Sequence, residues 1–187
     1  MLRTTLSITA LLLLSGLSYS APSHKLYQID MIVFTHQPAP NHETEQALSP
    51  LVPTDVRRAI PLQDLTGDAR TPYHLLPNST SQLNQEYWTL MHKTDYQVLA
   101  HYTWLQPSDN QRPIAIPSIH RNGWNIEGTL RVRQSNYYLL DTDLLFSTIN
   151  TSQTAFLFSQ KQRLKPGTVY YLDHPQAGML IKVHLVA

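Results

Sequence analysis

Cysteine is absent from this sequence of 187 residues. Its absence excludes disulfide bonds, catalysis by a thiol and every metal site built on thiolate ligands. A chain without cross-links depends on a packed core for its stability, and 42% of the residues are hydrophobic. The length is sufficient for one such core, so we expect a single globular domain.

Long hydrophobic runs are also missing. The longest apolar stretch, Leu6–Leu17, is too short to be a good membrane-spanning helix. It follows Arg3 and precedes the small residues Ser18 and Ser20, an order typical of a secretory signal peptide. We therefore predict a signal peptide over residues 1–20, and a periplasmic domain over residues 21–187 that keeps no transmembrane anchor. The alternative is an uncleaved N-terminal anchor.

The sequence also lacks an excess of charge of either sign. It has 14 basic and 13 acidic side chains, and within residues 1–20 the only charged side chain is that of Arg3. The mature domain is therefore expected to be neutral. A neutral domain produces no field that attracts nucleic acid or an anionic bilayer, so we expect neither as a partner.

Alternation of apolar and polar residues predicts a mainly antiparallel sheet. The clearest signal is a hairpin over residues 124–146, in which a turn at residues 134–136 keeps the apolar residues of both strands on one face. Further strands are predicted at residues 25–34, 96–106, 154–164 and 178–186. Because short turns join neighbouring strands, we expect antiparallel pairing.

One amphipathic helix is predicted at residues 81–94. Its apolar residues recur at helical spacing on one face, namely Leu83, Tyr87, Leu90 and Met91. Ser79 and Gln82 are candidates for a capping box at its start. The expected fold class is therefore α+β, a mainly antiparallel sheet with this principal helix packed on one face.

Proline is concentrated in one part of the chain. Seven of the thirteen prolines lie between residues 35 and 80, where no hydrophobic period is sustained. We interpret this part as a long extended segment within the same domain, since structureless loops of that length are unusual.

Familiar catalytic and metal-binding motifs are missing too. The sequence contains no Gly-x-Ser-x-Gly, His-Glu-x-x-His or Ser-x-x-Lys, which are common signatures of hydrolases. Its nine histidines form no i, i+4 pair on the helix and predict no metal site. We expect no catalytic residue, no metal and no cofactor, and so a protein that is not an enzyme. The alternative, a hydrolase, rests on Asp141 with Asp143 or on Asp173 with His174.

Two carboxylates lie on one face of the predicted hairpin. Asp141 and Asp143 would be about 6 to 7 Å apart along their strand, a separation that paired carboxylates use in glycoside hydrolysis. However, Arg131 and Arg133 on the partner strand favour ion pairs on a solvated face. We therefore interpret the carboxylates as structural.

The same face, together with a basic run at Lys161, Arg163 and Lys165, offers charged and aromatic side chains to a ligand or partner. It is equally consistent with a solvated surface. The candidate ligand- or partner-binding residues are Arg131, Arg133, Tyr137, Asp141, Lys161 and Arg163.

The C-terminal sequence is the most specific part of the chain. The basic Lys161 and Arg163 lead into a corner of Tyr171-Leu172-Asp173-His174-Pro175, which precedes Gly178 and an apolar last strand. "YQIDMIVF", "YQVLAHYTWLQP" and the hairpin occur before it in the same order. In this combination the chain resembles the CsiV-like peptidoglycan-binding family of gammaproteobacterial periplasmic proteins.

The resemblance implies a non-enzymatic factor that binds peptidoglycan and supports cell-wall assembly and cell shape. It further implies a protein partner, an outer-membrane lipoprotein that activates a class A penicillin-binding protein. The alternatives are an envelope adaptor that binds protein without binding glycan, and a hydrolase of the cell wall.

The adjacent Asp173 and His174 are predicted to form a structural corner. Neighbouring side chains of an extended chain point to opposite faces, so these two are badly placed to act as a pair. We expect the Asp173 carboxylate to accept backbone N–H groups after it, and Gly178 to supply a positive φ at the turn exit. The resemblance's signature residues, Tyr171, Asp173, His174, Pro175 and Gly178, are on this interpretation structural.

Overall fold

The computed structural model describes residues 25–36, 56–64, 71–135, 137–148 and 155–186. The described part of the chain consists mainly of β-strands with one α-helix, which confirms the predicted fold class. The elements are β1 (Leu26–His36), η1 (Val56–Arg58), β2 (Ile60–Pro61), η2 (Asn78–Thr80), α2 (Asn84–Met91), β3 (Tyr96–Pro107), β4 (Ile114–Ala115), β5 (Ile119–Arg121), β6 (Trp124–Gln134), β7 (Tyr138–Thr148), β8 (Ala155–Leu164), β9 (Val169–His174) and β10 (Ala177–Val186).

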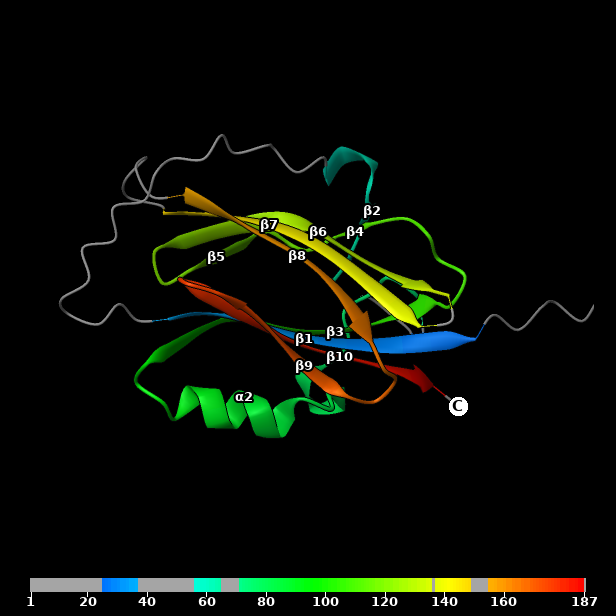
Figure 1. Ribbon diagram of the computed structural model, residues 1–187, viewed down its shortest axis with the longest axis horizontal. Helices are drawn as coiled ribbons and strands as arrows, with labels where there is room; N and C mark the ends of the chain where they lie inside the picture. Colours follow the sequence, from blue (N-terminus) through cyan, green and yellow to red (C-terminus); the bar gives the residue numbers. More distant parts are fainter. Residues whose placement is uncertain (1–24, 37–55, 65–70, 136, 149–154, 187) are drawn as a thin grey trace, which may run out of the picture.

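The strands form two sheets rather than one. A four-stranded sheet has the order β3-β1-β10-β9, and a six-stranded sheet has the order β2-β4-β6-β7-β8 with β5 paired to β6. The pairings between these strands are antiparallel except that of β2 with β4, and an isolated bridge between Gln63 and His74 is also parallel. Figure 1 shows the two sheets stacked, with α2 on the outer side of the four-stranded sheet. The fold therefore has three layers.

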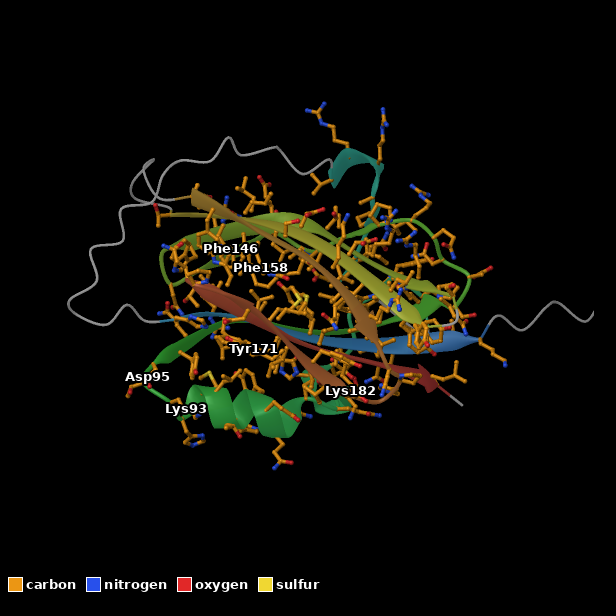
Figure 2. All side chains as sticks on the ribbon, viewed as in Figure 1. Lys93, Asp95, Phe146, Phe158, Tyr171 and Lys182 are labelled. Atoms are coloured by element: carbon orange, nitrogen blue, oxygen red, sulfur yellow. The ribbon has the colours of Figure 1, made fainter. Side chains whose placement is uncertain are left out.

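The main hydrophobic core lies between the two sheets. In β6 and β7 every second residue is buried, as expected for strands with one face on a core and the other in water. Phe146 and Phe158 point from the six-stranded sheet into this layer (Figure 2). From the other side Ile29, Met31 and Ile181 meet them as fully buried side chains.

A second, smaller cluster lies between the four-stranded sheet and the helix. It contains Ile32, Phe34, Leu83, Leu90 and Val98. Since β1 contributes to both clusters, it is buried on both faces along most of its length. This explains why its sequence reads as nearly continuously apolar rather than alternating.

The helix is shorter than the sequence predicts, and its predicted capping box is wrong. Residues 78–80 form the short turn η2, and α2 has Leu83 at its N-terminal boundary without a side-chain cap. The hydroxyl of Ser81 instead accepts the backbone N–H of Leu83 at 3.1 Å. No helix of the described residues is long and apolar enough to cross a membrane.

The proline-rich segment is partly described. Its first two residues, Thr35 and His36, belong to β1, while η1, β2 and η2 are short elements within it. The N–H of Leu76 donates to the carbonyl of Thr103, and Tyr73 donates similarly to Leu105, so residues 73–76 cover the edge of β3. The predicted signal peptide and residues 37–55 and 65–70 lie outside the described residues.

Candidate functional site

The outer face of the six-stranded sheet brings together the candidate residues. The structure places Arg131 opposite Asp141, two residues away from the register that a turn at residues 134–136 predicts, and β8 adds Lys161 on the other side of Asp141. The next row consists of Arg133, Leu139 and Arg163. We call these two rows, together with Tyr137 at the end of the hairpin, the basic face.

Asp141 is the centre of an ion-pair cluster. Its Oδ2 accepts hydrogen bonds from Arg131 Nε at 3.1 Å, from Arg131 Nη2 at 2.7 Å and from Arg133 Nη2 at 2.9 Å. The side chain of Asp141 is only 16% exposed. Charge-assisted bonds of this geometry hold planar guanidinium groups in a fixed orientation. Asp141 therefore positions the two arginines, which confirms the expected cross-strand ion pairs.

The second carboxylate is also engaged. Asp143 Oδ1 accepts a hydrogen bond of 2.6 Å from the hydroxyl of Ser159 on β8. Both carboxylates lie on the same face, as the alternation predicts. However, one is occupied by two guanidinium groups and the other by a hydroxyl of the neighbouring strand. This arrangement favours a structural role for the pair.

Tyr137 and Arg163 form an exposed cation–π pair at the end of the basic face. The Arg163 guanidinium carbon lies 5.5 Å from the centre of the Tyr137 ring, within the range of a cation–π contact. The Tyr137 side chain is 53% exposed. The pair thus presents an aromatic surface and a positive charge to solvent.

Two shallow hollows lie beside this pair. The larger, of about 320 Å³, is lined by Leu139 and Asp141 and by the cationic Arg133, Lys161 and Arg163. The smaller, of about 130 Å³, is lined by Tyr137 and residues of the adjoining turns. The basic face is therefore recessed, with cations around its larger hollow.

The cations of the larger hollow have more hydrogen-bond donors than the protein uses. Arg133 Nε is buried without a hydrogen-bond partner. Among the described residues Lys161 has no ion pair, and the cation–π contact with Tyr137 is the one interaction of the Arg163 guanidinium. The exposed donors of Lys161 and Arg163 can bind an anionic group from outside the protein.

The predicted corner at Asp173 and His174 is present as a hairpin turn. β9 ends at His174, Pro175 and Gln176 form the turn, and β10 begins at Ala177, opposite His174. The His174 ring stacks on Phe156, with ring centres 4.5 Å apart and an angle of 9° between the planes. This stack joins the four-stranded sheet to the six-stranded sheet. Burial lowers the pKa of His174, and the charge of Asp173 opposes that shift.

The sequence predicts the wrong acceptor for the hydrogen bond that fixes this corner. His174 Nδ1, rather than the Asp173 carboxylate, accepts the backbone N–H of Gln176 at 3.3 Å. The Asp173 carboxylate instead accepts a bond of 2.5 Å from the Tyr171 hydroxyl. Burial and this bond raise the pKa of Tyr171. Asp173 and His174 make these contacts separately, which agrees with a structural corner.

The prediction of a positive φ at Gly178 is wrong. Gly178 lies within β10, paired with Phe34 on one side and with Asp173 on the other, and it is not among the residues with positive φ. A Cβ atom at this position would overlap the Phe34 ring and lie 2.8 Å from Tyr171 Cε2. The rings of Phe34 and Tyr171 stack at 6.0 Å in this space. Glycine is therefore required by packing.

A comparison with protein families identifies the chain. Residues 6–186 match the family model described as "Peptidoglycan-binding protein, CsiV". The chain belongs to the CsiV family. No curated protein and no solved structure matches it. Because the match spans nearly the whole chain, it includes the basic face and the corner, and it confirms the resemblance found in the sequence.

Sequence reasoning missed a buried polar cluster in this CsiV-family chain. Asp30 on β1 is fully buried and accepts hydrogen bonds from Thr103 Oγ1 at 2.8 Å and Gln28 Nε2 at 3.1 Å. His184 Nδ1 lies 3.8 Å from the Asp30 carboxylate, and His184 Nε2 lies 2.9 Å from Gln82 Nε2. The strand predicted at residues 25–34 contains Asp30, but the sequence does not show that η2 and the following turn cover the face of β1 that carries it.

A second buried pair lies beside this cluster. His101 Nε2 and Ser81 Oγ are 2.8 Å apart, and both residues are buried. Burial lowers the pKa values of His101 and His184, and the nearby charge of Asp30 opposes both shifts. These contacts fix residues 80–82 on the four-stranded sheet. Within the described ranges, no three histidine or acidic side chains come together in a way that suits a metal ion.

Proposed function

We propose that this CsiV-family chain is a non-enzymatic factor that binds peptidoglycan through the basic face. Family membership is the observation that carries the proposal, because the family is described by peptidoglycan binding. Arg133, Tyr137, Lys161 and Arg163 are the contacting residues. Asp141 holds Arg131 and Arg133 in place and, with Arg131, forms the support of the surface.

The chemistry of the basic face supports this assignment. Peptidoglycan combines sugar rings with short peptides that carry carboxylates. An exposed tyrosine ring offers a flat apolar surface to a sugar or to a peptide side chain. Guanidinium groups offer planar pairs of donors to carboxylates. The basic face presents both kinds of group beside a hollow.

The proposed location is the periplasm, which the predicted signal peptide over residues 1–20 supports. There the protein would assist cell-wall assembly through a partner, an outer-membrane lipoprotein that activates a class A penicillin-binding protein. A surface away from the basic face is available for a protein contact. Trp88 and Met91 on α2 are 58% and 45% exposed. These two side chains favour the second candidate function, an adaptor that binds protein alone.

Co-sedimentation with purified sacculi tests the proposal. The purified protein should sediment with sacculi at low salt, and Arg163→Gln together with Lys161→Gln should release it. Lys93→Gln is a matched control, because Lys93 is also a cation over a tyrosine ring, 5.7 Å from the centre of Tyr96. Figure 2 shows Lys93 near the end of α2, beyond the four-stranded sheet.

The same experiment separates the alternatives. A protein that stays in solution at low salt, while still capturing an envelope protein, would be an adaptor without affinity for the wall. Release of soluble muropeptides from the sacculi, abolished by Asp141→Asn, would instead identify a hydrolase. We expect sedimentation without release.

A further inference from the structure

The larger hollow of the basic face contains an imbalance of charge. Arg133, Lys161 and Arg163 line it, and Asp141 is the carboxylate among its lining residues. The Oδ2 atom of Asp141 already accepts three N–H donors. The protein therefore neutralises the positive charges that line the hollow only in part.

The spacing of these cations is set by the sheet. Arg133 and Arg163 lie two strands apart, with Leu139 between them, so their backbones are about 10 Å apart. Lys161 and Arg163 lie on one face of β8, about 6 to 7 Å apart along the strand. Three cations at such distances around a leucine side chain suit a small ligand with more than one anionic group and an apolar part.

The contact of Arg163 with Tyr137 prepares it for such a ligand. The guanidinium carbon lies 5.5 Å from the ring centre, within the range of a cation–π contact. No described residue accepts a hydrogen bond from this guanidinium group, so its N–H groups can donate in pairs to a carboxylate. Because the ring restricts the guanidinium before binding, less side-chain entropy is lost on binding.

We propose that the larger hollow binds the free carboxylates of the peptide stems of peptidoglycan and not its sugar backbone. This inference rests on the proposed function and names the part of the polymer that is recognised. Within the polymer the sugar backbone is uncharged, and it would leave Lys161 and Arg163 without counter-charges. A peptide stem carries free carboxylates together with alanine methyl groups, which match the cations and Leu139.

Chemical blocking of the carboxylates tests this inference. Native sacculi are compared with sacculi whose carboxylates have been converted to amides, and binding of the purified protein is measured by sedimentation. We expect amidation to weaken binding by about 10-fold or more, since several charge-assisted hydrogen bonds are lost. Free stem tetrapeptide should compete with native sacculi, whereas an oligosaccharide of N-acetylglucosamine should not.

Single substitutions in the larger hollow show whether the peptide stems bind there. Arg163→Gln and Lys161→Gln should each weaken competition by the free tetrapeptide by about 5- to 10-fold, and Lys93→Gln should leave it unchanged. Equal binding to native and amidated sacculi, or competition by the oligosaccharide, would overturn the inference while leaving peptidoglycan binding intact. Failure to bind native sacculi would overturn both. Unchanged competition in the two hollow variants would show that the stems bind elsewhere.

Discussion

The guanidinium group of Arg163 lies over the ring of Tyr137, with 5.5 Å between its central carbon and the ring centre. The two residues come from different strand ends of the six-stranded sheet, and their contact borders the two hollows of the basic face. This relationship joins the aromatic and the cationic part of the surface. It makes the orientation of Arg163 dependent on the Tyr137 ring.

Tyr137→Ala should therefore weaken binding to sacculi even if the tyrosine hydroxyl makes no contact with the ligand. An exposed cation–π contact contributes about 0.5–1 kcal/mol, which corresponds to a loss of about 2- to 5-fold in affinity. Tyr137→Phe keeps the ring and should retain binding. Sedimentation across a range of sacculus concentrations measures both variants. Equal losses in the two variants would show that the hydroxyl, and not the ring, is required.

Asp141→Asn separates a structural from a catalytic role of this carboxylate. The substitution removes the negative charge that Arg131 and Arg133 share at Oδ2. Because these arginines are partly exposed, we expect the free energy of unfolding to fall by only about 1 kcal/mol. Urea denaturation measures this change. Binding to sacculi should persist, since the surface becomes more positive and the amide oxygen of the substituted side chain can still accept an arginine N–H. Muropeptide release should be absent both before and after the substitution.

Gly178→Ala tests the packing beneath Tyr171. The added methyl group would overlap the ring of Phe34 and approach that of Tyr171, so overpacking should lower the free energy of unfolding by about 1–3 kcal/mol. Phe34→Leu removes much of the overlapping ring. The double variant should then lose less stability than the sum of the two single variants. Additive losses would contradict a direct contact between the two positions.

Stability should decrease as the pH falls below about 6.5, because three histidines are held neutral by burial. The pKa values of His101, His174 and His184 are all lowered from the ordinary value of 6.5. In this window the unfolded chain binds more protons than the folded protein, so acid favours unfolding. Urea denaturation at pH 7.5, 6.0 and 5.0 measures the trend. A midpoint that stays constant or rises on acidification would contradict it.

His184→Gln identifies one source of this pH dependence. The groups around His184 are the carboxylate of Asp30, which opposes the shift in its pKa, the ammonium group of Lys182, which strengthens it, and the side-chain amide of Gln82. The variant should show a shallower loss of stability between pH 7.5 and 5.0, because one proton-linked group has been removed. A slope unchanged from that of the unsubstituted protein would exclude His184 as a contributor.

The faces of the β6–β7 hairpin could be predicted from the sequence, but its register could not. Alternation assigns Arg131 and Asp141 to the same face. The turn predicted at residues 134–136 would pair Arg131 with Leu139, whereas the structure pairs Gln134 with Tyr138 and therefore Arg131 with Asp141. The division into two sheets could not be predicted in this way. Alternation of apolar and polar residues shows that one face of a strand is buried, but it does not show which element covers that face. In β1 both faces are covered.

Gly178 and Asp30 have roles that the local sequence does not show. The place of Gly178 after Pro175 predicts a turn conformation, whereas the ring of Phe34, distant in sequence, determines the need for glycine. Asp30 is fully buried beside His184, and its hydrogen-bond partner Gln28 also donates to Thr80 of η2. Local sequence carries conformational preferences. Contacts between distant segments decide the role of these residues.

The central claim, that the basic face holds the protein on peptidoglycan, is tested most directly by one comparison. The fraction of protein that sediments with native sacculi is measured for the unsubstituted chain and for the double variant Lys161→Gln with Arg163→Gln, with circular dichroism confirming an intact fold. We predict that the unsubstituted protein sediments and that the folded double variant remains in solution. Sedimentation of the folded double variant to the same extent as the unsubstituted protein would contradict it.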